Sequence, residues 1–295
     1  MPRMISTRAA QALTGVAALA LLATACTSPG GAAQNSTPPA NRNPFGHVHG
    51  MAADPDTGQV LLATHYGLFD VSTEPAEKLS PTIDLMGFAA TADAGHFYAS
   101  GHPGEGSDLP NPVGLIHSND GGKTWTPLSR PGESDFHALA TTRDGIIGFD
   151  GQLRISADGQ EWSTVQTSLE PVALAGSPES DIVLATTEDG VQRSTDGGNT
   201  WLLPDGAPLL MFTAFADPRT AVGVAPDSTV HVSRDAGNSW EQTGKVSAPA
   251  AAITAAVDDA GELRIWVTTD NGVEHSADGG AAFDTAIRTT GSVER

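Results

Sequence analysis

Five of the nine histidines occur in a pattern that suits metal binding. His47 and His49 form a His-x-His pair, and residues two apart on a β-strand face the same side. His65, His102 and His137 follow in the first half of the chain. Three imidazole nitrogens that leave one coordination position open suit a catalytic zinc or copper ion better than a closed structural site. We therefore predict a Zn or Cu site, with His47 and His49 as the first ligands and His137 as the next.

Acidic residues accompany these histidines. Asp84, Asp135 and Glu170 can orient imidazoles as hydrogen-bond partners, or act as the paired carboxylates of a glycosidase. Tyr66 follows His65 directly and is a further catalytic candidate. Three interpretations stay open: a metal site, a metal-free polar ligand pocket, and polar side chains that line a wet channel.

The elements that must position these residues repeat along the chain. Related phrases begin at serines separated by 38, 38, 39 and 43 residues: SNDGGKTW at Ser118, SADGQEW at Ser156, STDGGNTW at Ser194, SRDAGNSW at Ser233 and SADGGAAF at Ser276. A sixth, eroded copy is expected around Ser72, and residues 100–112 form an insertion. A period near ~40 residues is typical of propeller blades.

Each period contains four short strand patterns, and the repeated phrase falls in the turn between the third and the fourth. An apolar first strand (HALATT, for example) precedes a second strand such as GIIGFDG. Because successive strands are antiparallel, the first strands begin where the second strands end, at one end of a propeller. We call this the top end. It holds the histidines, the acids and Tyr66 named above, all from consecutive blades.

The repeated phrase resembles the Asp-box (BNR) repeat, over about residues 46–290. The resemblance implies an all-β, six-bladed β-propeller, or a seven-bladed one if a degenerate copy exists. It also implies a structural role in turns for five aspartates: Asp120, Asp158, Asp196, Asp235 and Asp278. Each carboxylate would accept backbone N–H bonds across its turn.

The resemblance extends to bacterial lipoproteins described as sialidase-like or glycosyl-hydrolase-like. Sialidase chemistry requires three arginines on the substrate carboxylate, and we find no such triad, although Arg130 falls near the top end. Glycoside hydrolysis of another kind and a protein-interaction scaffold stay as alternatives to the metal site. We expect a small-molecule, glycan or protein ligand at the top end.

The first residues indicate export. Residues 1–25 combine Arg3 and Arg8 with a short apolar run, which predicts a signal peptide that ends before Cys26. The stretch LLATAC resembles a lipobox, so Cys26 is the expected lipidation site; the alternative is an ordinary signal peptide with an incidental cysteine. Residues 26–45 form a flexible tether and residues 46–295 the propeller domain. The predicted location is the outer face of a bacterial cytoplasmic membrane, which the protein contacts through its lipid anchor alone.

The charge excludes one class of partner. The formal net charge of −20 opposes binding to nucleic acid. With 33 glycines and 20 prolines, the composition favours many short strands joined by turns. We expect a monomer.

Overall fold

The computed structural model describes residues 45–287, which contain strands, turns and bends but no helix. The predicted signal peptide and nearly all of the tether, with Cys26, lie outside the described residues. The strands form six antiparallel sheets, so the predicted six-bladed β-propeller is confirmed and the seven-bladed alternative is wrong.

The first three blades each contain four consecutive strands. Blade 1 consists of β1 (Val48–Ala53), β2 (Val60–Thr64), β3 (Gly67–Asp70) and β4 (Glu77–Lys78). Blade 2 consists of β5 (Ile83–Ala90), β6 (Phe97–Pro103), β7 (Leu115–Ser118) and β8 (Thr126–Ser129). Blade 3 consists of β9 (Ala138–Thr142), β10 (Gly145–Phe149), β11 (Leu153–Ser156) and β12 (Ser163–Thr164).

The remaining blades follow the same order with one exception. Blade 4 has only β13 (Ala173–Gly176), β14 (Val183–Thr187) and β15 (Gly190–Ser194). Blade 5 consists of β16 (Phe212–Phe215), β17 (Ala221–Val224), β18 (Thr229–Ser233) and β19 (Glu241–Lys245). Blade 6 consists of β20 (Ala250–Val257), β21 (Leu263–Thr269), β22 (Gly272–Ser276) and β23 (Asp284–Ile287).

The expected fourth strand of blade 4 is absent. The chain after β15 makes one isolated bridge, between Arg193 and Leu202. Pro204 and Pro208 follow within the next few residues and cannot donate ladder hydrogen bonds, so the segment continues as a loop.

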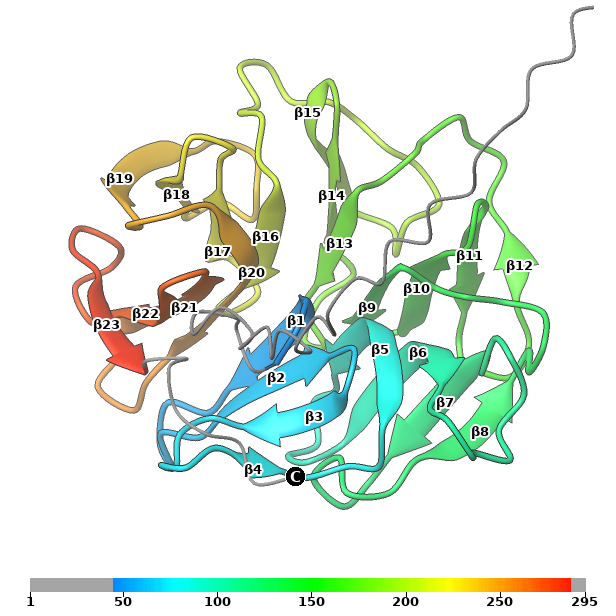
Figure 1. Ribbon diagram of the computed structural model, residues 1–295. Helices are drawn as coiled ribbons and strands as arrows, with labels where there is room; N and C mark the ends of the chain where they lie inside the picture. Colours follow the sequence, from blue (N-terminus) through cyan, green and yellow to red (C-terminus); the bar gives the residue numbers. More distant parts are fainter. Residues whose placement is uncertain (1–44, 288–295) are drawn as a thin grey trace, which may run out of the picture. The chain divides into compact units, whose positions relative to one another are not determined.

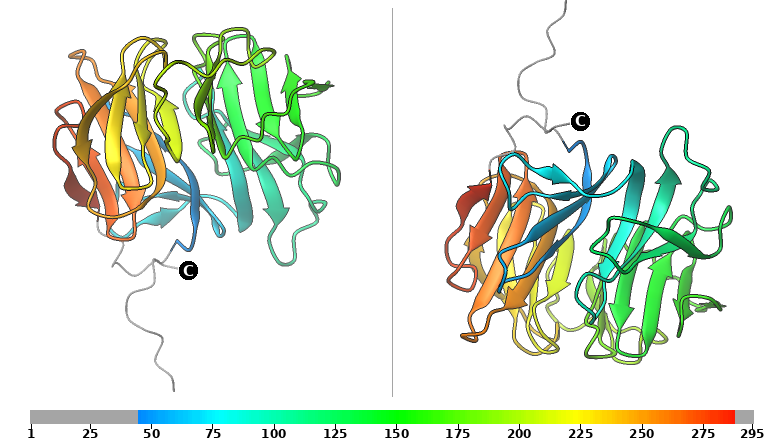
Figure 2. Two further views of the ribbon diagram at one scale, coloured as in Figure 1. Left: turned by 90° about the horizontal axis from the view of Figure 1, so that it is seen from above. Right: turned by 90° about the horizontal axis from the view of Figure 1, so that it is seen from below.

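The first strands of the six blades surround the centre of the ring (Figure 1). Each of β1, β5, β9, β13, β16 and β20 packs against the next, and β20 packs against β1. Blades 1 and 6 lie next to each other in both views of Figure 2, although neither lends a strand to the other sheet. The ring is therefore closed by packing between blades.

The core lies between the blades, as β2 illustrates. Val60 and Leu62 pack in a cluster with Trp266 of blade 6, whereas Leu61 packs with Leu85 of blade 2. All five residues of β2 are buried because neighbouring blades cover both of its faces. This explains why β2 is a nearly continuous apolar run with no polar alternation.

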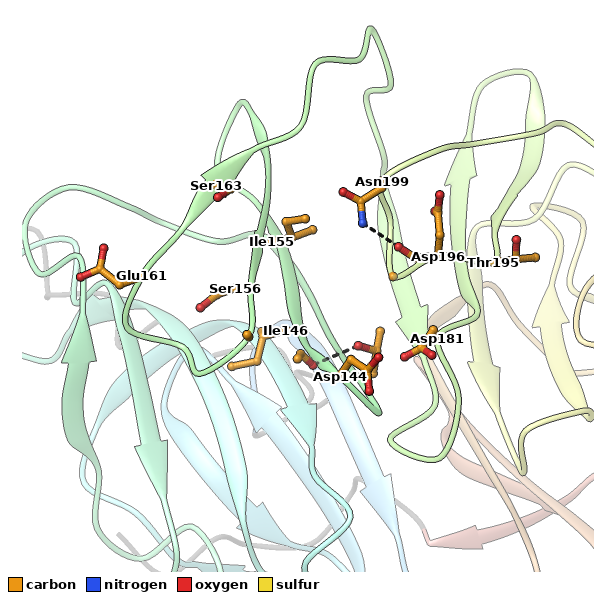
Figure 3. A pocket seen from close by; sticks show the side chains of 14 residues that line it. Asp144, Ile146, Ile155, Ser156, Glu161, Ser163, Asp181, Thr195, Asp196 and Asn199 are labelled. Carbon is orange, nitrogen blue, oxygen red and sulfur yellow. Dashed lines mark hydrogen bonds between the residues drawn. The ribbon is translucent and has the colours of Figure 1, made fainter.

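The five repeated phrases form turns with the same hydrogen bonds. In each, the serine hydroxyl donates to the aspartate Oδ1 at 2.8–3.3 Å. The same serine Oγ accepts a glycine N–H at 2.8–2.9 Å. The Asp196 turn is drawn in Figure 3, where the Asn199 side chain donates to the Asp196 carbonyl. This geometry supports the structural role expected for the five aspartates.

The eroded sixth copy differs from the expectation. In blade 2 the turn serine, Ser118, pairs with Phe97 of the second strand. In blade 1 the corresponding contact is made by Val71, whose N–H donates to Val60 O, so Val71 takes the position of the turn serine. Ser72, the expected serine, comes one residue later and donates instead to the Asp70 carboxylate.

Candidate functional site

The top end of blades 1–3 brings the predicted site residues together in two groups. The strand directions are as expected: His65, which follows β2, donates its backbone N–H to the His47 carbonyl just before β1. In blade 2, Asp84 at the start of β5 pairs with His102 near the end of β6. Asp135 and His137 directly precede β9.

The first group, which we call unit 1, consists of His49, His65 and Asp84. One ligand atom from each lies within 4.8 Å of the others. The separation from Asp84 Oδ1 is 2.8 Å for His65 Nδ1 and 3.6 Å for His49 Nε2. Both His49 Nε2 and Asp84 Oδ1 are buried and have no well-formed hydrogen bond among the described residues. Unit 1 therefore brings two ring nitrogens and a carboxylate oxygen to one small volume.

The environment keeps His49 neutral. Burial lowers the pKa of His49 below its usual value of 6.5, and the neighbouring His65 lowers it further. Asp84 opposes these effects but does not outweigh them. His49 therefore has an unprotonated nitrogen at neutral pH, which is the form that binds a metal ion.

His47 lies beside unit 1 but outside it. Its ring centroid is 5.0 Å from that of His65 and 6.4 Å from that of His49, and its side chain is exposed. The pairing of β1 with β2 shifts between Val48 and Gly50, so His49 is the extra residue of a bulge. A bulge re-aims side chains, which is why His65 rather than His47 is the nearer partner of His49.

The second group, unit 2, consists of His102, Asp135 and His137. The Nε2 atoms of His102 and His137 lie 3.1 Å and 2.7 Å from the same oxygen, Asp135 Oδ2. Asn111, from the insertion, contacts the other ring nitrogen of His102 at 2.8 Å. Asp135 is held in place because the next residue, Phe136, donates its N–H to Ser100 Oγ in β6. Sequence reasoning did not single out Asn111.

The two remaining candidates contact neither unit. Glu170 is exposed and forms no hydrogen bond or ion pair with the described residues. The Tyr66 side chain is 51% exposed, and its ring lies over Gly46.

A separate cleft lies at the opposite end of the propeller, between blades 3 and 4 (Figure 3). Its volume is about 510 Å³, and its lining includes Asp144, Asp181 and Asp196. Asp181 forms an ion pair with Arg143, and Asp196 is committed to its turn. The cleft contains no histidine, and sequence reasoning did not predict it.

Among the described residues, there is no helix with the length and apolar character needed to cross a membrane.

Comparisons with known proteins find partial sequence similarity to two xyloglucanases. No family model matches the sequence. An oligoxyloglucan-reducing end-specific xyloglucanase of Emericella nidulans is 31% identical over 173 residues, which cover 54% of this chain and 19% of that enzyme. A xyloglucanase of a Paenibacillus species is 28% identical over 174 residues, covering 53% of this chain and 16% of the enzyme. The chain thus spans less than a fifth of the length of the curated relatives it matches.

Solved structures share the fold. The GH74 xyloglucanase of Xanthomonas campestris superposes with a TM-score of 0.58 at 14% identity, covering 83% of this chain and 38% of that one. Virginiamycin B lyase of Staphylococcus aureus superposes with a TM-score of 0.53 at 12% identity, covering 85% and 87% of the two chains. The chain is therefore a β-propeller similar to glycoside hydrolases, and its assignment to the Asp-box repeats stays a prediction.

Proposed function

We propose that the chain is a propeller whose working site is the top end of blades 1–3, and that unit 1 binds a divalent transition metal. The observation that carries the proposal is the convergence of His49, His65 and Asp84 within 4.8 Å, with two buried ligand atoms that lack well-formed hydrogen bonds. Two imidazoles and one carboxylate are a ligand set for zinc, and copper also accepts imidazole. A fourth position, left to water or substrate, would give such an ion Lewis-acid chemistry.

Elemental analysis tests the proposal directly. The purified protein is incubated with zinc or copper at pH 7, desalted, and its metal content measured. We expect wild-type protein to retain metal and His49→Ala to retain one ion fewer per chain, while keeping its far-UV circular dichroism. His96→Ala is the matched control, because His96 also lies near an aspartate, at 3.8 Å from Asp93, but at the opposite end. Wild-type protein that retains neither zinc nor copper refutes the proposal.

The comparisons favour a second candidate, glycoside hydrolysis, over the metal site. The similarity to two xyloglucanases supports it, and Asp84 and Asp135 supply carboxylates at one end of the ring. A sialidase mechanism gains no support, because Arg130 is bound to Ser134 and Glu133. Release of reducing sugar from xyloglucan oligosaccharides, lost in Asp135→Asn, would support this candidate. No release from xyloglucan or other β-glucans would reject it.

We also propose the location expected from the sequence. The predicted signal peptide and Cys26 support an extracytoplasmic protein held to the membrane by lipid, with the propeller beyond a tether of about 20 residues. This proposal does not depend on the proposed metal site.

A further inference from the structure

The two units are built by the same rule on neighbouring blades. His65 follows β2 of blade 1 and reaches Asp84 at the start of β5 in blade 2. His102 near the end of β6 in blade 2 reaches Asp135, just before β9 of blade 3. The strand pairing makes His65 and His102 equivalent. Ala63, two residues before His65, pairs with Gly50, and Ser100, two residues before His102, pairs with Gly87. Unit 2 therefore repeats the histidine–carboxylate contact of unit 1 one blade further around the ring.

Asn111 of the insertion contacts the ring of His102. Its Oδ1 is 2.8 Å from His102 Nδ1, and an amide oxygen only accepts hydrogen bonds, so in this orientation of the amide Nδ1 carries the hydrogen. In neutral His102 the lone pair is therefore on Nε2, which faces Asp135 Oδ2 at 3.1 Å. A lone pair and a carboxylate oxygen at this separation repel each other unless a cation lies between them. Metal-binding histidines typically donate their other ring N–H to an oxygen in this way.

The remaining atoms of unit 2 supply further potential ligands. Asp135 Oδ1 is buried and has no hydrogen-bond partner among the described residues. His137 Nε2 forms a hydrogen bond of 2.7 Å with Asp135 Oδ2, which brings a second imidazole to the same carboxylate. Among residues 45–287, unit 1 alone has three ligand atoms within 4.8 Å of one another. The His137 side chain is 59% exposed, however, so it can rotate toward an ion held by the other two.

We infer that unit 2 is a second transition-metal site, with His102 Nε2, Asp135 and His137 as ligands and Asn111 as the residue that positions His102. This inference rests on the proposed function of unit 1, and it makes the top end a two-ion surface. A proton shared by His102 Nε2 and Asp135 Oδ2 would occupy the same place and compete with the metal.

The stoichiometry of zinc retained by the full chain tests the inference. The protein is loaded with zinc at pH 7 and desalted, and its zinc is titrated with a chromophoric chelator. We expect two zinc ions per chain in wild-type protein, and one in Asp135→Asn. We also expect one in His49→Ala, which keeps unit 2. His96→Gln, at the opposite end, keeps both ions.

A second variant covers the case in which Asp135→Asn fails to fold. Asn111→Ala changes an exposed side chain that touches no ligand atom of unit 1. We expect it to weaken the second ion by about 10–100-fold and to leave the affinity of the first unchanged. Wild-type protein that retains a single zinc, lost in His49→Ala and unaffected by Asn111→Ala, overturns the inference and leaves the proposed function intact. A protein that retains no zinc overturns the inference, and one that retains neither zinc nor copper overturns the proposed function as well.

Discussion

Replacing Asp196 with alanine removes the acceptor of three hydrogen bonds in the turn after β15. The Asp196 carboxylate accepts from the Ser194 hydroxyl at 2.8 Å, from Thr200 N–H at 2.9 Å and from the Thr200 hydroxyl at 2.7 Å. Burial of the carboxylate would raise its pKa, but these hydrogen bonds outweigh burial and lower it. The charged form of Asp196 is thus favoured by the folded turn.

The size of the effect follows from exposure. A hydrogen bond to a charged acceptor contributes about 1.5–3 kcal/mol where it is well formed and shielded. Asp196 is exposed, so water replaces part of each bond, and we expect Asp196→Ala to lower the free energy of unfolding by about 2 kcal/mol in total. For a domain of this size, that loss corresponds to a fall in melting temperature of about 4–8 °C.

Thermal unfolding at pH 7, followed by circular dichroism, measures this shift. Asp205→Ala is the matched control, because Asp205 is exposed and its side chain forms no hydrogen bond or ion pair with the described residues. The control should melt within about 1 °C of wild type, as is usual for a surface substitution. If Asp196→Ala has the same melting temperature as the wild type, the Asp196 carboxylate does not stabilise the fold. Loss of metal or ligand binding without a change in melting temperature would assign the turn a functional role.

Three further predictions concern other parts of the chain. Gly87→Ala should destabilise the fold more than Gly50→Ala at the equivalent position of blade 1, because the new Cβ would lie 2.2 Å from the Phe136 carbonyl oxygen rather than 3.0 Å from a side chain. Urea unfolding measures the loss of unfolding free energy in both variants, and equal losses would contradict the reasoning. The pKa of Asp235 is lowered to about 2 from 3.8, because hydrogen bonds, chiefly from Ser239, outweigh its burial. Its stabilising effect is thus complete above pH ~4 and lost toward pH 2, so the difference in unfolding free energy between wild type and Asp235→Asn should shrink over that interval; a constant difference would contradict it. Cys26→Ser should abolish lipid attachment and leave precursor or released protein; a variant that is processed normally and stays on the membrane would rule out the lipoprotein assignment.

The blade count and the gathering of most candidate residues at one end were predictable because both depend on regular features. A repeat near ~40 residues specifies one four-stranded unit per copy, and antiparallel order then places His65, His102 and Asp84 at one end. The five turn aspartates were found for the same reason, since each turn repeats the same local hydrogen bonds.

The departures occur where the chain is irregular. The bulge at His49 breaks the two-residue alternation on which the His47–His49 pair was predicted. A signal was present, because Gly50 and Gly87 stand at equivalent positions inside strand patterns, where glycine often marks a bulge. Nothing in the sequence indicated that Asn111 would contact His102, since that contact depends on how the insertion folds back.

The two units draw all their residues from positions 49 to 137, in three blades that are consecutive along the chain. In repeat architectures each unit contacts mainly its sequence neighbours, so these contacts have short sequence separation and can form early in folding. Among the described strands, the junction of blade 1 with blade 6 joins the most distant parts of the chain. A nascent chain can therefore assemble the histidine–carboxylate surface before blades 4–6 have been synthesised. Substitutions in blades 4–6 also leave the residues of both units unchanged.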